Sequence, residues 1–240
     1  AAVYRSRHWW VPTALVFVAV STVIAWWVAV TPAVQASIAA PEEIRQLIEH
    51  DFEDYYSANP AASFAAQVWT NNAWVAAGTL MLGVFLGLPV LYILFTNAAN
   101  VAVAAGLMAA HGRLEIFLGL ITPHGLLELT AVFVAAGTGL RLGWTVIDPG
   151  PRSRGTALAE QGRVAVGMAI GLTGVLLVSG VIEAFVTHSG IPTWARIAMG
   201  VATEVAFLAY VWVYGRRAAE AGETGDLASA DRGDELPVSA

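Results

Sequence analysis

Long apolar stretches constrain the fold of this 240-residue chain more than any other feature. Five of them are about 20 residues long, enough for a helix to cross the hydrocarbon core of a bilayer. They lie at roughly 9–30, 73–95, 124–147, 164–187 and 192–214. Only 12% of the residues are charged, whereas an ordinary soluble domain has about 25%. Backbone groups inside a bilayer must be hydrogen-bonded within the protein, so the sequence predicts an all-α, polytopic transmembrane bundle.

The segment 97–123 leaves the number of spans open at five or six. It is apolar on both sides of the interruption His-Gly-Arg-Leu-Glu at 111–115, so it is either one span with a polar middle or a broken, re-entrant pair of half-helices. Short loops that carry Arg favour the cytoplasmic side. The Arg residues within 5–7, 152–163 and 216–217 share one side only if 97–123 crosses the membrane. We therefore favour six spans with both termini in the cytoplasm.

The parts outside the spans predict two further regions. Residues 41–70 begin at Pro41 and combine acidic side chains with apolar ones at helical spacing, which predicts an amphipathic, extracytoplasmic helical segment that caps the bundle. Residues 1–217 then form the transmembrane helical domain, and 218–240, rich in Gly, Ala, Ser, Asp and Glu, form a disordered cytoplasmic tail. Because residue 1 is Ala rather than Met, we expect the natural chain to begin further upstream.

Composition excludes several classes of function. The chain contains no Cys, which excludes disulfides and thiolate metal sites. Its net charge of −6 comes mainly from 42–54 and 220–235, so no nucleic-acid partner is expected. It also contains no Lys, and no Gly-rich stretch has the ending of a phosphate-binding loop. Glycines within the spans therefore predict helix-packing contacts, at Gly83 and Gly87 and at Gly167, Gly171 and Gly174.

Polar residues inside the apolar stretches give the best indication of a functional site. His124 and Glu128, in Thr-Pro-His-Gly-Leu-Leu-Glu-Leu at 122–129, are four residues apart and share a helix face. Ionisable groups in hydrocarbon are costly, so they face a bundle interior, a partner or a watery cavity. We expect an intramembrane polar cluster of His124, Glu128, Glu183, Asn71 and Asn72. Secondary candidates are Glu204, His188, Asn97 and His111.

Three interpretations of this cluster remain open. The side chains can pin helices together by hydrogen bonds, or they can carry an ion or proton through the membrane. The third is a metal-dependent membrane hydrolase with His124, Glu128 and Glu183 as ligands. The zinc-protease helix signature has His, Glu and His at its first, second and fifth positions; here Gly125 and Glu128 occupy the second and fifth. We therefore expect no cofactor, while enzyme activity and metal binding stay open from the sequence alone.

Several motifs in combination resemble one known family. They are Asn71-Asn72, the span with Gly78, Gly83 and Gly87, the heptapeptide Pro-His-Gly-Leu-Leu-Glu-Leu at 123–129, and Ile-Glu-Ala-Phe-Val-Thr at 182–187. Over most of 1–217 the chain resembles the stage II sporulation protein M family of bacterial and archaeal integral membrane proteins. His124, Glu128 and Glu183 match its motif positions, but the resemblance carries over no catalytic residue.

The resemblance implies a multi-pass protein of the inner or plasma membrane of a bacterial cell. The named member of the family acts in endospore formers as a scaffold that recruits peptidoglycan-remodelling hydrolases during engulfment. For this chain it implies a membrane scaffold or assembly subunit of cell-envelope processes. The expected partners are the lipid bilayer and other membrane or envelope proteins, and the small-residue faces also favour a homodimer. The rival interpretation is an ion- or proton-coupled channel or transporter that uses His124, Glu128 and Glu183.

Overall fold

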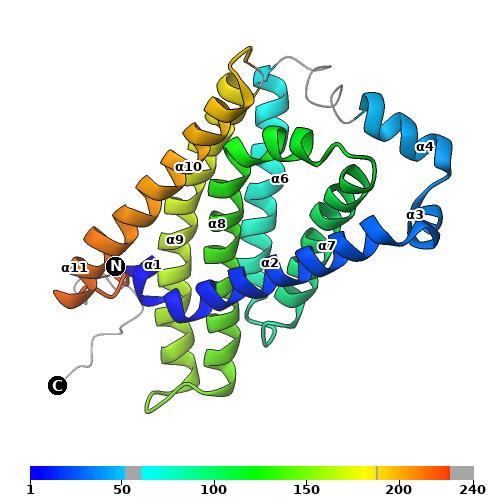
Figure 1. The fold of residues 1–240 in the computed structure, drawn as a ribbon. Helices are drawn as coiled ribbons and strands as arrows, with labels where there is room; N and C mark the ends of the chain where they lie inside the picture. The colour runs from blue at the N-terminus through cyan, green and yellow to red at the C-terminus, as the bar shows by residue number, and fades with distance from the viewer. Residues whose placement is uncertain (52–60, 188, 228–240) are drawn as a thin grey trace, which may run out of the picture.

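The computed structural model describes residues 1–51, 61–187 and 189–227. Every regular element within these ranges is a helix (Figure 1), which confirms the predicted all-α class. The long helices are α2 (Arg7–Val30), α6 (Ala61–Leu82), α7 (Leu88–Ala110), α8 (Leu114–Ile147), α9 (Arg154–Ile182) and α10 (Thr193–Tyr210). The short ones are α1 (Ala2–Arg5), α3 (Pro32–Ile38), α4 (Pro41–Gln46) and α11 (Arg216–Glu220). Single π-helical turns continue α4, α9 and α10: η1 (Leu47–Asp51), η2 (Glu183–Thr187) and η3 (Val211–Gly215).

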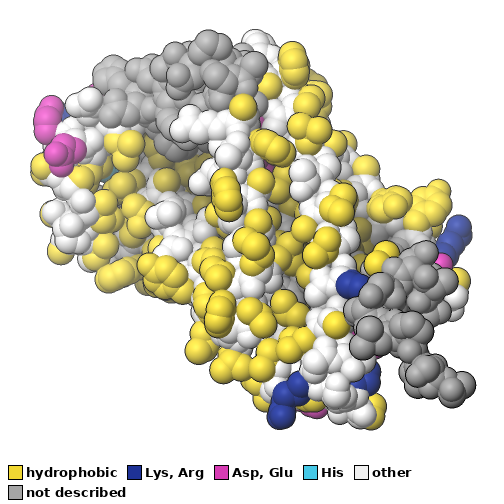
Figure 2. Space-filling view, turned by 180° about the vertical axis from the view of Figure 1, so that it is seen from behind, with side chains coloured by type: hydrophobic (Ala, Val, Ile, Leu, Met, Phe, Trp, Pro, Cys, Tyr) yellow, Lys and Arg dark blue, Asp and Glu magenta, His cyan; other side chains and the backbone are white. Residues whose placement is uncertain are grey.

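Five helices are long and apolar enough to cross a membrane, which confirms the membrane class. They are α2, α7, α8, α9 with its η2 extension, and α10 with its η3 and α11 extensions. The remaining long helix, α6, packs against α7, α8 and α9. Figure 2 shows hydrophobic side chains spread across the middle of one face, with basic side chains at the lower edge and the right and acidic side chains at the upper left. A protein that spans a bilayer needs an apolar surface toward the lipid tails, with its charged side chains near the two membrane surfaces.

The predicted single span at 73–95 is wrong. Helix α6 ends at Leu82, and a turn at 83–87 reverses the chain before α7 starts at Leu88. Leu86 and Gly87 have φ values of +58° and +73°, which a helix interior does not allow. Pro89 then stands in the first turn of α7, where its missing N–H costs nothing. Residues 73–95 are apolar throughout, so their composition gives no sign of the turn.

The break expected within 97–123 lies at 111–113, where Gly112 has φ +72°. The residues before it are the end of α7, and those after it begin α8. Both helices are therefore longer than the predicted half-helices. Figure 1 shows the N-terminus, α11 and the α8–α9 loop toward the lower left, and α3, α4 and the start of α10 toward the top and right.

Helix α8 is the axis of the bundle and contacts α2, α6, α7, α9 and α10. Its middle, from Ala131 to Ala136, is buried. Pro123 lies inside this helix, and Figure 1 shows the first turns of α8 running across the top before the chain bends downward. A proline in a helix interior removes one backbone hydrogen bond and clashes with the preceding turn, so a bend at this place is expected.

Glycines on α8 bring neighbouring backbones into direct contact. A Cβ added at Gly139 would lie 2.0 Å from the carbonyl oxygen of Thr79 on α6, and one added at Gly83 would lie 2.2 Å from that of Gly139. The predicted packing role of Gly83 is therefore confirmed. The same prediction is wrong for Gly171 and Gly174, because no described atom lies within 4 Å of a Cβ built there.

The ends of the chain pack on the bundle. Ile44 and Ile48, on α4 and η1, are buried against Val28 of α2 and Leu107 of α7, while Glu42 and Glu43 are exposed. The predicted amphipathic segment thus covers one end of the bundle at 41–51, and 61–70 belongs to α6. In the tail, the Arg163 guanidinium donates two hydrogen bonds to Asp226, of 2.7 and 3.0 Å, and so holds 218–227 against α9. Residues 52–60 and 228–240 lie outside the described residues.

Candidate functional site: a polar cavity between α6, α7, α8 and η2

The predicted cluster lines a single cavity of about 930 Å³, here called the polar cavity. Helix α6 contributes one wall, α7 a second, α8 a third, and η2 closes the fourth side. The side chains share an unusual polarity for a membrane interior, since most carry an amide, hydroxyl, imidazole or carboxyl group. The polar members are Gln67, Thr70, Asn71, Asn72, Asn97, Asn100, His124, Glu128 and Glu183.

His124 ties α8 to the end of α9. Its side chain is buried, with Nε2 at 3.7 Å from Glu183 Oε1 and Nδ1 at 3.2 Å from the hydroxyl oxygen of Thr187. The backbone carbonyl of His124 accepts a 2.9 Å hydrogen bond from the hydroxyl of Ser179. Three polar side chains spaced by four residues on α9 and η2 therefore surround one histidine. The acidic member, Glu183, is completely buried.

The π-helical turn helps to explain why Glu183 and Thr187 both reach this site. A π turn inserts one extra residue into the α-helical repeat and so rotates the residues that follow it. Such turns are frequent at functional sites. In η2 the turn begins at Glu183 and ends at Thr187, the two side chains that lie near His124.

Glu128 lies one turn beyond His124 on the same face of α8. The Asn72 amide on α6 makes a side-chain hydrogen bond to it. Its other oxygen, Oε1, is buried and has no hydrogen-bond partner among the described residues. Leaving a buried acceptor unsatisfied costs about 1–3 kcal/mol, and more for a charged group. Glu128 and Glu183 are also close enough to influence each other electrostatically, so the polar cavity brings two carboxyl groups together.

The secondary candidates divide between this cavity and other places. Asn97 lines the cavity and donates a 2.8 Å hydrogen bond to the carbonyl of Ile93. Glu204 lies outside it, on α10, where it accepts a 2.8 Å hydrogen bond from Thr130. His111 is exposed after the end of α7. His188 lies outside the described residues.

Some residues of the site escaped the prediction. Gln67 and Thr70 were assigned to a segment outside the membrane, yet with Asn71 they form a polar stripe at helical spacing on α6. Ser179 and Thr187 complete a second stripe with Glu183, at intervals of four residues. A search for polar residues recurring every three or four positions inside apolar helices would have found both stripes.

The arrangement offers no metal centre in the described part of the chain. No group of three or more His, Asp or Glu side chains there lies close enough together to hold a metal ion. His124, Glu128 and Glu183 share the cavity but do not converge as ligands. Their geometry instead suits hydrogen bonding and attraction of a positively charged group.

The apolar helices and the polar cavity together define a polytopic helical membrane protein with a polar site inside the bundle. The chain belongs to the SpoIIM family, because the family model described as Stage II sporulation protein M matches residues 14–188. That range holds every residue of the polar cavity, and the family resemblance seen in the sequence is thereby confirmed. No curated protein and no solved structure matches the chain.

Proposed function

We propose that this protein is a membrane scaffold or assembly subunit of cell-envelope processes, and that its polar cavity receives a positively charged segment of a partner protein. Membership of the family supports the scaffold role. The observation that carries the binding role is the buried, unsatisfied Oε1 of Glu128 in the wall of the cavity. A basic side chain from a partner would satisfy this oxygen and reduce the repulsion between Glu128 and Glu183.

The composition of the cavity wall supports this choice of partner. Its amides come from Gln67, Asn71, Asn72, Asn97 and Asn100, and none of its lining residues carries a fixed positive charge. A buried carboxyl group gains most from a cation held in good hydrogen-bonding geometry. Truncating one member of such a buried charge pair at an interface typically costs about 2–5 kcal/mol of binding free energy. The cavity therefore fits a Lys or Arg side chain better than an acidic or apolar group.

The position of the cavity indicates which side the partner approaches from. Applying the positive-inside rule, we assign the end of the bundle that carries the N-terminus and α11 to the cytoplasm; its basic residues are Arg5, Arg7, Arg152, Arg154, Arg216 and Arg217. The cavity is lined by the first half of α6, the middle of α7 and the early part of α8. These parts belong to the opposite half of the bundle, so the partner segment approaches from the extracytoplasmic side.

A photo-reactive amino acid at Asn71, which is exposed at the cavity wall, tests this proposal in native membranes. We expect a discrete cross-linked partner with Asn71 and none with the same probe at Leu15, an exposed residue of α2 outside the cavity. The cross-link should disappear in Glu128→Gln and persist in Glu115→Gln, a matched change of an exposed Glu on the same helix. An unchanged cross-link in Glu128→Gln would contradict the binding role.

The rival function is an ion or proton pathway, which the same cavity also favours because it holds His124, Glu128 and Glu183. It requires a polar route to the other side of the membrane. Immediately after Thr130, α8 is fully buried and apolar from Ala131 to Ala136, so the described residues give this route no support. Flux in reconstituted vesicles, present in the wild type and abolished in a folded Glu128→Gln variant, would establish transport in place of scaffolding.

A further inference from the structure

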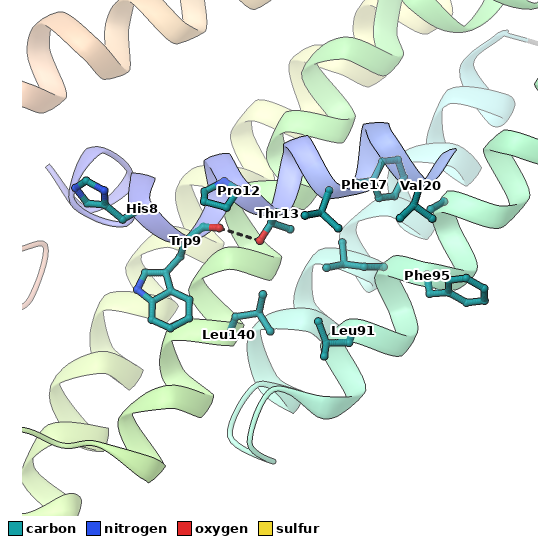
Figure 3. A pocket seen from close by; sticks show the side chains of 12 residues that line it. His8, Trp9, Pro12, Thr13, Phe17, Val20, Leu91, Phe95 and Leu140 are labelled. Carbon is teal, nitrogen blue, oxygen red and sulfur yellow. Dashed lines mark hydrogen bonds between the residues drawn. The ribbon is translucent and has the colours of Figure 1, made fainter. Parts of the chain in front are cut away.

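A second cavity, about 480 Å³ in volume, lies between α2 and α7 and is separate from the polar cavity; we call it the α2/α7 groove. Figure 3 shows α2 along one side, Leu91 and Phe95 of α7 opposite it, and Leu140 of α8 between them. The lining is almost entirely apolar. Its one hydroxyl, on Thr13, already donates a 2.8 Å hydrogen bond to the Trp9 carbonyl. The groove itself therefore suits a hydrocarbon chain.

One end of the α2/α7 groove is marked by residues typical of the membrane surface. His8 and Trp9 lie there (Figure 3), and the rings of Trp9 and Trp144 are in contact, with centroids 6.3 Å apart. Tryptophan prefers the level of the lipid headgroups. From His8 to Val20, α2 advances about 18 Å at 1.5 Å per residue, close to half of a hydrocarbon core of about 30 Å. The groove thus extends from headgroup level to the bilayer centre.

Positively charged side chains gather near the same end. Arg141 follows the groove residue Leu140 on α8 and is partly buried. Its charge lies close enough to Arg5 and Arg152 to be repelled by both. Arg152 is paired with Glu160, whereas the side chains of Arg5 and Arg141 have no ion pair or hydrogen bond in the described part of the chain. Arg5 is exposed and Arg141 is partly buried, and a partly buried cation at a membrane boundary is costly unless an anion offsets it.

We propose that the α2/α7 groove is a binding site for an anionic phospholipid, with one acyl chain along the groove and the phosphate against Arg5 and Arg141. Arginine recognises phosphate through charge-assisted, bidentate hydrogen bonds, and basic pockets between membrane helices on the cytoplasmic side bind anionic headgroups. This site faces the leaflet opposite to the polar cavity, and it stands whether or not the scaffold function is correct.

The size of the groove argues against a partner helix as its occupant. The empty space in and above the groove, about 1000 Å³, spread over a length of about 18 Å leaves a mean cross-section of roughly 56 Å². A helix with side chains is about 10 Å across and needs a cross-section of roughly 80 Å². An extended acyl chain is much narrower than a helix, so a lipid tail is the occupant that the groove admits.

Native mass spectrometry of the purified protein, titrated with phosphatidylglycerol or with phosphatidylcholine of the same acyl chains, tests the site. We expect the wild type to prefer phosphatidylglycerol. Arg141→Gln and Arg5→Gln should each weaken that preference about fivefold, since one basic residue near an anionic lipid contributes about 1 kcal/mol. Arg217→Gln, which removes an exposed charge at the same end outside the groove, should leave it unchanged. Size-exclusion chromatography and melting temperature confirm that each variant is folded.

A further variant tests the acyl-chain part of the site. Val16 lines the groove and is 62% exposed, so Val16→Trp fills the groove without disturbing the core. It should weaken binding of both lipids while the melting temperature is retained. The proposal is overturned if the wild type binds the two lipids equally, if Arg5→Gln and Arg141→Gln behave like Arg217→Gln, or if Val16→Trp binds both lipids as tightly as the wild type.

Discussion

Replacing Glu128 by Gln separates a structural role of the polar cavity from a binding role. In the free protein, Glu128 Oε1 is buried without a hydrogen-bond partner among the described residues, and an ionised Glu128 lies close enough to repel an ionised Glu183. An unsatisfied buried acceptor costs about 1–3 kcal/mol. Glutamine keeps an oxygen for Asn72 and removes the repulsion, although its own amide then needs a partner. We therefore expect the free energy of unfolding to rise by about 1 kcal/mol, while partner binding is lost.

Reversible unfolding in mixed micelles, followed by circular dichroism, measures the change for Glu128→Gln. Glu115→Gln is the control, because Glu115 is exposed on the same helix and such substitutions usually change stability by less than about 0.5 kcal/mol. A fall of about 1 kcal/mol or more in Glu128→Gln alone would refute the reasoning. It would mean that the carboxyl group mainly pins α8 to α6, as the structural interpretation of the cluster holds.

Three further outcomes are expected. Gly139→Ala should lower the melting temperature strongly, because its Cβ would lie 2.0 Å from a backbone oxygen of α6. Gly174→Ala is the comparison, because a Cβ there has open space around it; it should raise the free energy of unfolding by about 0.5–1 kcal/mol through helix propensity. Asp226→Asn should weaken the paired hydrogen bonds from Arg163 and make limited proteolysis near 216–227 faster, while proteolysis of the α8–α9 loop stays unchanged. Ser179→Ala removes a buried hydrogen bond between α9 and α8; it should cost about 0.6 kcal/mol in the same unfolding assay, and no loss would show that the bond contributes nothing.

Sequence spacing accounts for the part of the candidate site that lies on a single helix. His124 and Glu128 share a face because of their spacing of four on α8, and the structure places both on the polar cavity. Glu183 was included because a carboxyl group inside an apolar span must face the protein interior. The short approach of Glu183 to His124, 3.7 Å, depends on how α9 packs on α8 and on the turn η2. Neither can be derived from spacing.

The prediction of span limits failed where the hydrophobic pattern is continuous. Nothing in the apolarity of 73–95 distinguishes a helix from a turn, and the turn at 83–87 depends on the positive φ values of Leu86 and Gly87. Gly83, Gly87 and Pro89 were visible, but glycines inside a span are also typical of helix packing. The structure assigns Gly83 to packing and Gly87 to the turn.

The sequence by itself determined the membrane class, the helical secondary structure and the family. Each follows from local properties: the length of apolar runs, the need to satisfy every backbone hydrogen bond within a helix in hydrocarbon, and short motifs read in order. The tertiary structure alone decided that Asn72, Glu128 and Glu183 line one cavity, and that residues of α2, α7 and α8 together line the α2/α7 groove. These juxtapositions depend on which helices approach closely. Lipid is as apolar as the side chains it contacts, so hydrophobicity does not select which helices pack together in a bilayer. Close backbone packing at residues such as Gly139 does.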